Sequence, residues 1–348
     1  MTDLAEWKVR GPVRTLRREF AEWDPANEAW QAPRGVTVVT FRPDGQLSEA
    51  EFHNPNGSVA RRARAYDEVG RLVGAEFWSD GGPRSRIRYY YDAAGRSSRT
   101  VNVTPDGTEH DVETCHYDDA GRKTKVQYLA VPRPNTEISY AVEGTEHAFA
   151  APGATTSTVV YDDRELPAEV TFHDANHAIV RRIVLSRDGD GHLMTEAVYF
   201  GGEAFADLPA AIDDAPAEER VQLAALLANV FADRTFSTTT YRYDEVGRLQ
   251  ERTMRMGSLS EERTTFRYDD KDNPIEEISE SHSRDIHLDD AGAVQAREEE
   301  PRVRHVRFEY QYDAQGNWTE QTVWIRTDSQ LEYRCSNIER RAITYYEN

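Results

Sequence analysis

A short motif that recurs about every 25 residues constrains the fold more than any other feature of this sequence. Copies of the pattern Tyr-Asp-x-x-Gly begin at Tyr66, Tyr91, Tyr117, Tyr243 and Tyr312. A fixed period of this length is typical of repeat architectures, in which each unit packs mainly against its neighbours. The chain is therefore expected to form one extended body rather than several unrelated domains.

Each copy has the chemistry of a strand followed by a tight turn. The residues before the tyrosine alternate between aromatic and mostly polar types, which is typical of a half-buried β-strand. The aspartate of the motif can start a turn, because its side chain can accept a hydrogen bond from the backbone N–H two residues later. The motif aspartates are Asp67, Asp92, Asp118, Asp244 and Asp313. The glycine three residues later supplies the positive φ of a type I turn with a G1 bulge; these are Gly70, Gly95, Gly121, Gly247 and Gly316.

A return strand follows each turn, and a second turn closes the unit. Asn56-Gly57 and Asp80-Gly81-Gly82 have suitable turn chemistry. Each unit is thus two strands and two turns, which accounts for the repeat length. We predict an all-β fold: an elongated, twisted and curved antiparallel sheet of about twenty strands with one helical insertion.

The recurring motif resembles the YD repeat of the bacterial Rhs and animal teneurin families. Weaker copies begin at Phe41, Tyr161, Asp188, Tyr268 and Leu288, so the resemblance covers most of the chain. It implies a spiralling sheet that encloses a space, which in Rhs proteins holds a toxic C-terminal domain. This chain is short and ends in a strand-like segment, so no toxin is expected after it. It looks more like the stand-alone bacterial YD proteins of unassigned function.

Breaks in the period divide the chain. Residues 13–23 can be read as a helix or as an irregular edge strand, and we favour the strand because Gly11-Pro12 suits a helix start poorly. The expected segments are an N-terminal cap (1–35), a repeat array (36–128), an irregular excursion (129–157), further repeats (158–200), a helical insertion (201–235), and a final array with the C-terminal strand (236–348).

One segment, residues 216–231, predicts a strong amphipathic helix. Its apolar stripe falls at helical spacing and consists of Leu223, Leu226, Leu227 and Val230. Pro216 suits the first turn, and acidic residues lie near the N-terminal end. The stripe must bury against something. We favour a lid or plug on one face of the sheet, and a partner-binding helix is the alternative.

Charge and cysteine content limit the partners and the compartment. The 42 basic and 62 acidic residues give a net charge of −20, which disfavours nucleic acid and anionic membranes. No stretch is apolar enough to span a bilayer, and the N-terminus lacks the apolar core of a signal peptide. A cytoplasmic product is expected, and a secreted or surface origin stays open as the alternative. Cys115 and Cys335 are too few for a disulfide framework, although one bond between them stays open.

Residues suited to chemistry are few. Paired carboxylates occupy the turn position of the repeat, where they are expected to be turn residues rather than a glycosidase pair. His173 and His177 flank a turn, which removes the helical geometry of a metal site. Asp188-Gly189-Asp190-Gly191 is similar to a calcium loop, but fits a repeat turn better. We expect no cofactor, no metal and no catalytic residue.

These features favour a non-catalytic binding or scaffold protein that presents a curved sheet face to a protein partner. The alternative is a carbohydrate or cell-envelope binder that uses exposed Trp and Tyr side chains. The regular placement of tyrosine favours an aromatic ladder between strands over a set of sugar-stacking rings. Enzymatic activity is not expected.

Overall fold

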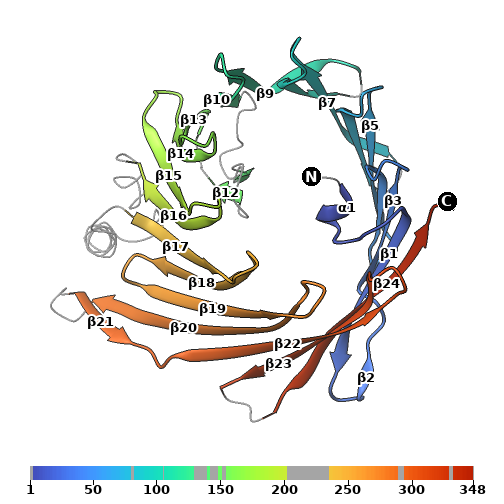
Figure 1. Ribbon diagram of the computed structural model, residues 1–348, viewed down its shortest axis with the longest axis vertical. Helices are drawn as coiled ribbons and strands as arrows, with labels where there is room; N and C mark the ends of the chain where they lie inside the picture. Colours follow the sequence, from blue (N-terminus) through green and yellow to red (C-terminus); the bar gives the residue numbers. More distant parts are fainter. Residues whose placement is uncertain are drawn as a thin grey trace. The chain divides into compact units, whose positions relative to one another are not determined.

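The computed structural model shows an all-β protein made of antiparallel strand pairs, and the described residues contain one short helix, α1 (Asp3–Glu6) (Figure 1). The structure describes residues 3–79, 82–104, 106–128, 139–141, 148–150, 154–201, 235–288, 294–328 and 332–347. The all-β, antiparallel fold expected from the repeat is confirmed. The predicted helical insertion, with Leu223, Leu226, Leu227 and Val230, lies outside the described residues.

The chain divides into two compact units. Unit 1 contains residues 1–112, 267–277 and 304–348, and unit 2 contains residues 113–266 and 278–303. The strands of unit 1 are β1 (Val13–Asp24), β2 (Ala29–Trp30), β3 (Gly35–Phe41), β4 (Leu47–His53), β5 (Val59–Tyr66), β6 (Leu72–Ser79), β7 (Gly82–Tyr91), β8 (Ser97–Val103), most of β22 (Arg302–Tyr312), β23 (Trp318–Thr327) and β24 (Arg334–Tyr345).

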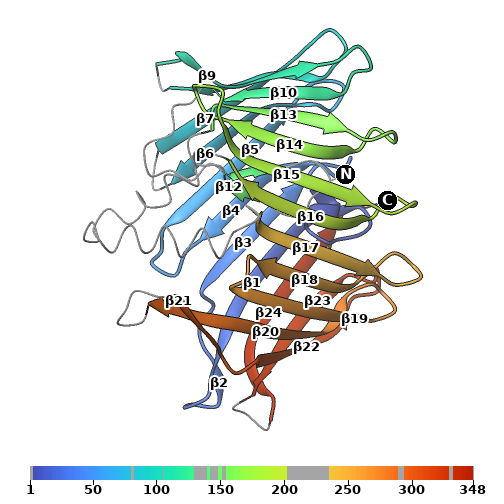
Figure 2. The same ribbon diagram turned by 90° about the vertical axis from the view of Figure 1, so that its left-hand side faces the viewer.

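Unit 2 is a run of antiparallel hairpins in chain order (Figure 2). Its strands are β10 (Lys123–Tyr128), β11 (Ser139–Ala141), β12 (Ala148–Ala150), β13 (Thr156–Tyr161), β14 (Pro167–His173), β15 (Ile179–Arg187), β16 (Leu193–Phe200), β17 (Thr235–Tyr243), β18 (Leu249–Met256), β19 (Ser260–Tyr268) and β21 (Val294–Glu298). Four strands contribute residues to both units: β19, β22, β9 (Glu109–Tyr117) and β20 (Pro274–Leu288).

The first strand of the chain is an interior strand of its sheet. β1 pairs with β3 on one side and with β24 on the other, so the first and last strands are neighbours (Figure 1). The prediction of a strand over residues 13–23 is confirmed, but its placement at an edge is wrong. The elongated array expected from the sequence is wrong for the same reason: the first and last strands satisfy each other's backbone hydrogen bonds.

Two hydrophobic clusters anchor the units. In unit 1, Val13 and Leu16 of β1 pack with Val39, Phe41 and neighbouring residues, and Leu4 and Trp7 of the N-terminal segment lie against them. In unit 2, Phe172, Ile183 and Val198 form the centre of a second cluster that spans β14 to β17. Each cluster lies on one face of a sheet, as the alternation of the strand sequences requires.

Candidate functional sites

The predicted turn residues form a repeated hydrogen-bonded unit. At Asp67, the backbone N–H donates to the carbonyl of Arg71 (2.9 Å), and Gly70 N–H donates back to the Asp67 carbonyl (3.0 Å). The Asp67 carboxylate accepts hydrogen bonds from Val69 N–H, Arg71 N–H and Arg71 Nε. Hydrogen bonds led by the backbone N–H of Arg71 lower the pKa of Asp67. The glycine φ is +83° at Gly70, a region that favours glycine.

The same geometry recurs at the other clear copies. Backbone bonds of this pattern close the turns that begin at Asp92, Asp118, Asp244 and Asp313. Their glycines have φ values between +79° and +85°: Gly95, Gly121, Gly247 and Gly316. The turn residues therefore have a local structural role, and the carboxylates among them are occupied by their own turns.

The repeat tyrosine connects its unit to the preceding turn. Tyr91 donates its hydroxyl proton to the carbonyl of Leu72 (2.7 Å), and the guanidinium of Arg71 lies over the Tyr91 ring at 4.8 Å. Tyr66, Tyr161 and Tyr243 make the equivalent bond to Leu47, Lys123 and Leu193. The ring and the hydroxyl thus hold adjacent units together through a cation–π contact and a hydrogen bond.

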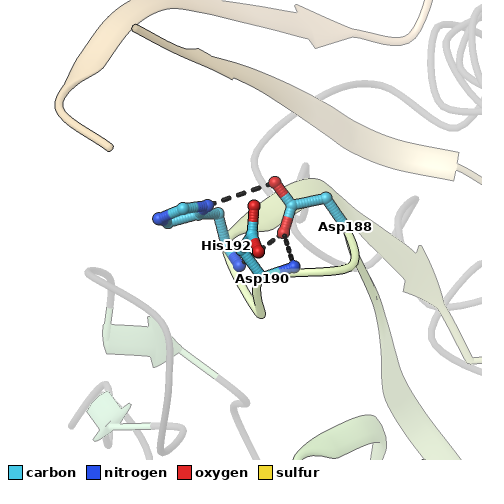
Figure 3. Close-up of side chains that lie close together, drawn as sticks. All are labelled: Asp188, Asp190 and His192. Carbon is cyan, nitrogen blue, oxygen red and sulfur yellow. Dashed lines mark hydrogen bonds and ion pairs between the residues drawn. The ribbon is translucent and has the colours of Figure 1, made fainter. Parts of the chain in front are cut away.

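One turn replaces the arginine by histidine and gathers three possible metal ligands. Asp188, Asp190 and His192 lie together in this turn (Figure 3). The Asp188 carboxylate accepts bonds from the N–H groups of Asp190 and His192, and His192 Nδ1 lies 3.1 Å from Asp188 Oδ2. The imidazole of His192 stacks on the Tyr243 ring, with the ring centroids 4.8 Å apart, and takes the place of the arginine of other units. The cluster is a variant of the repeat turn.

The histidine pair considered from the sequence is part of another turn. His177 adopts a φ of +66°, and its N–H donates to the carbonyl of Asp174 (3.1 Å). Among the residues that the structure describes, His173 and His177 do not belong to a cluster of metal-ligating groups.

Two turns of unit 1 carry asparagine where others have arginine. Asn273 donates to the Tyr312 hydroxyl (2.9 Å), and Asn317 donates to the Tyr345 hydroxyl (2.8 Å). Each of these hydroxyls donates to the turn aspartate, Asp269 or Asp313. Burial, followed by the hydrogen bond to Asp313, raises the pKa of Tyr345 to about 12. At these two turns the tyrosine hydroxyl therefore bonds to turn side chains, whereas Tyr91 bonds to a backbone carbonyl.

Buried charges hold the N-terminal segment on unit 1. Arg341, whose side chain is 4% exposed, pairs with Glu339 (3.0 Å) and stacks on Trp318. Its Nη1 also approaches the carbonyls of Trp7 and Lys8 at 3.4 Å. Burial lowers the pKa of Arg341 to about 10, which leaves it charged at neutral pH. The buried Arg341 thus contacts the N-terminal segment and helps to hold it against unit 1.

The two faces of the unit 1 sheet differ in composition. One face carries a series of ion pairs along and across the strands: Arg17–Glu19, Arg61–Glu49, Arg86–Glu76 and Arg340–Glu320. Cross-strand partners share a face, so the pairing register places Phe20, Phe52, Phe77 and Arg62 on the other face. We call this second set the aromatic patch.

The aromatic patch is open to solvent. Phe20 and Phe52 are each 38% exposed, and they flank Gly35 and Thr37 of β3. Arg62 lies over the Phe77 ring at 5.5 Å, and its Nε is buried without a hydrogen-bond partner in the described structure. Large aromatic side chains beside a guanidinium are the composition typical of interface centres. The sequence did not single out these residues.

A carboxylate lies inside the hydrophobic face of unit 2. Glu196 on β16 is 3% exposed and pairs across the sheet with Leu185 and with Thr239, which is also buried. Its Oε2 has no hydrogen-bond partner within the described part of the chain. Burial raises the pKa of Glu196 to about 7. The only sequence signal was a glutamate in a strand that is apolar on both faces.

Both cysteines are free thiols, which answers the question left open by the sequence. Burial, with Glu113 beside it, raises the pKa of Cys115 to about 11. Burial also raises the pKa of Cys335. Neither thiol has the depressed pKa of a nucleophilic cysteine.

Comparison with known proteins gives distant structural matches only. No family model and no curated protein matches this sequence. A porin-like protein from Bacteroides uniformis is 10% identical, with 95% of this chain and 96% of that chain covered and a TM-score of 0.36. The TcdB2-TccC3 structure is 12% identical over 87% of this chain, which spans 17% of that chain, with a TM-score of 0.27.

A third match is a putative outer membrane lipoprotein-sorting protein domain from Vibrio parahaemolyticus, 9% identical over 58% of this chain and 84% of that one, with a TM-score of 0.15. The cytoplasmic location expected from the sequence is withdrawn, because the first match is described as porin-like and the third as an outer membrane lipoprotein-sorting protein domain. At these TM-scores the likenesses support nothing further. Among the described residues, no helix is long and apolar enough to cross a bilayer.

Proposed function

We propose that this chain is a YD-repeat protein that binds a protein partner without catalysing a reaction, and that the aromatic patch of unit 1 is its binding surface. The observation that carries the proposal is the difference between the two faces of one sheet. Arg–Glu pairs cover one face, whereas the other face, on which Arg18 pairs with Glu339 beside Phe20, also presents Phe20 and Phe52 as exposed aromatic side chains. Exposed aromatic surface of this kind is characteristic of protein interaction sites.

The patch has the elements of an interface centre. Phe20 lies on β1 and Phe52 on β4, on either side of β3, so little backbone freedom is lost at these residues on binding. Arg62 is stacked on Phe77, and such an arginine can meet a carboxylate of the partner.

Affinity capture from lysate and envelope fractions of the source organism tests the proposal. The baits are the wild-type chain, Phe20→Ser/Phe52→Ser, and the control Val69→Ser/Val246→Ser, which removes two apolar side chains that are 74% and 73% exposed at turn tips. We expect one protein to be retained in stoichiometric amount by the wild type and the control, and to be lost from the patch variant. Retention by all three baits, or by none, would refute the assignment.

A carbohydrate-binding role is the alternative, and a specific feature favours it. Trp23 of β1 and Trp30 of β2 are half-exposed and form an edge-to-face pair with ring centroids 5.1 Å apart. Exposed indole rings can stack on the apolar faces of sugars. A glycan array probed with the wild type and with Trp30→Ala separates this role from protein binding, because the aromatic patch remains intact in the variant.

A further inference from the structure

A hollow in unit 1 lies where the N-terminal segment meets the two asparagine turns. It has a volume of about 540 Å³ and is lined by Leu4 to Gly11 in part, by residues 271–274, and by residues 316–318. Pockets of about 300 to 1,000 Å³ are typical for small-molecule ligands. Asn273 and Asn317 line the hollow, and an asparagine fills less of this space than the arginine found at the same turn position in the repeats that begin at Tyr66 and Tyr91.

The walls of the hollow are held in place by several contacts. Asn317 accepts a bond from Arg10 N–H (2.7 Å) through Oδ1 and donates to the Arg10 carbonyl (2.9 Å) through Nδ2. Arg10 Nη2 donates to the carbonyl of Lys271 (3.2 Å). Lys271 Nζ lies over the Tyr312 ring at 4.6 Å. The segment and both turns are therefore joined by hydrogen bonds around the opening, so the hollow is largely preformed.

The charge of the lining is mainly positive, although the chain as a whole is acidic. Lys8, Arg10 and Lys271 line the hollow together with one acid, Asp272. Lys271 pairs with the exposed Asp270 (3.1 Å). In the described structure, neither Lys8 nor Arg10 lies within ion-pair distance of a carboxylate. Most other surface arginines of unit 1 have such a partner, for example Arg61 and Arg86.

A second hollow shows the contrast. A pocket in unit 2 is lined by Arg255, Glu261, Arg284 and Glu298, among others. Its arginines pair with its own acids at 2.6 Å and 3.4 Å. Each arginine of this pocket thus has an acidic partner in the lining, whereas Lys8 and Arg10 at the hollow of unit 1 have none among the described residues.

We propose that the hollow of unit 1 binds a small organic anion, with its carboxylate or phosphate group at Lys8 and Arg10 and a compact apolar body toward Leu4, Pro274 and Trp318. Charge-assisted hydrogen bonds from the two cations select the anionic group. The apolar lining selects against free inorganic anions. The inference goes beyond the proposed partner binding, because the aromatic patch contributes no residue to this hollow.

Calorimetric titration of the full chain with phenyl phosphate, phenylacetate and benzyl alcohol tests the proposal. We expect saturable binding of at least one of the two anions and none of the neutral alcohol. The stronger of the two anions identifies the preferred acidic group. Binding should weaken as the salt concentration rises, because screening reduces the attraction of exposed cations.

Three variants locate the site. Lys8→Ala/Arg10→Ala should lower the affinity about tenfold or more, and the exposed Arg14→Ala, which removes one positive charge outside the hollow, should change it less than about twofold. Asn273→Arg should abolish binding by filling the space. Circular dichroism checks that each variant is folded, and Lys8→Gln replaces the double variant if that one unfolds. No binding of either anion, equal binding of the alcohol, or unchanged affinity after loss of Lys8 and Arg10 would overturn the proposal.

Discussion

Replacing Glu196 by glutamine should remove a specific part of the pH dependence of folding stability. The side chain is 3% exposed, lies between Leu185 and Thr239, and has a pKa raised from 4.5 to about 7 by burial. The folded state therefore binds a proton more tightly than the unfolded state. The stabilising effect of the protonated form is complete below pH 4.5 and is lost as the pH rises through 7. A pKa rise of this size corresponds to a contribution of about 3 kcal/mol to the free energy of unfolding.

The assay is urea unfolding of the wild type and Glu196→Gln at pH 5, 6, 7 and 8, followed by circular dichroism. The quantity of interest is the difference in unfolding free energy between the two proteins, because shared histidine titrations cancel in it. We expect Glu196→Gln to gain up to about 3 kcal/mol relative to the wild type between pH 5 and pH 8, since glutamine has no charge to bury.

Glu169→Gln is the matched control. Glu169 lies on β14 of the same unit, and its hydrogen bond and ion pair with Arg182 (2.6 Å) lower its pKa. It is ionised in both states above pH 5, so its loss should change stability by an amount that does not vary from pH 5 to pH 8. A pH-independent difference between Glu196→Gln and the wild type would show that the carboxylate is solvated in solution, and would refute the reasoning.

Three further predictions concern a repeat turn, the tyrosine link between units and a buried thiol. Gly247→Ala should cost about 1 kcal/mol or more in urea unfolding because its φ is +84° and a Cβ would lie 3.0 Å from His192 Nε2, whereas Gly189→Ala, with open space at that position, should be close to neutral. Tyr91→Phe should lower the free energy of unfolding by about 1 kcal/mol, because the hydrogen bond to the Leu72 carbonyl is lost. Tyr89→Phe is the control, and equal effects of the two substitutions would contradict the role of the Tyr91 hydroxyl in joining the units. Cys115 should react with iodoacetamide at pH 8 far more slowly in the folded chain than in the urea-unfolded chain, because burial raises its pKa to about 11. Mass spectrometry measures the two rates, and equal rates would exclude the raised pKa.

The hairpin turns were predictable because their chemistry is local. Asp67 and Gly70 are three residues apart, and the backbone conformation they require depends on their own side chains. The strand alternation before each tyrosine was equally local, which is why the all-β class was correct. The link from Tyr91 to Leu72 was not predictable, because the motif shows which residue recurs and not which carbonyl its hydroxyl reaches.

Longer-range features were out of reach of the sequence. The segment Val13–Asp24 has the pattern of a strand, but nothing in it specifies that Thr344 and Thr40 lie on its two sides. The aromatic patch was missed for the same reason: Phe20 and Phe52 come together only through the register of β1, β3 and β4. The lining of the hollow likewise joins residues more than 250 positions apart, such as Arg10 and Lys271.

The distribution of charge explains where function should be sought. Exposed ion pairs such as Arg61–Glu49 and Arg340–Glu320 contribute about 0 to 1 kcal/mol each, so they are poor candidates for what stabilises the sheet. Their effect is to give one face of the sheet a hydrophilic surface with compensated charges. The buried clusters and the tyrosine links supply the stability instead. Phe20 and Phe52 are exposed aromatic side chains, and Lys8 and Arg10 line a hollow without a carboxylate partner among the described residues. A binding role is therefore most reasonable for these four residues.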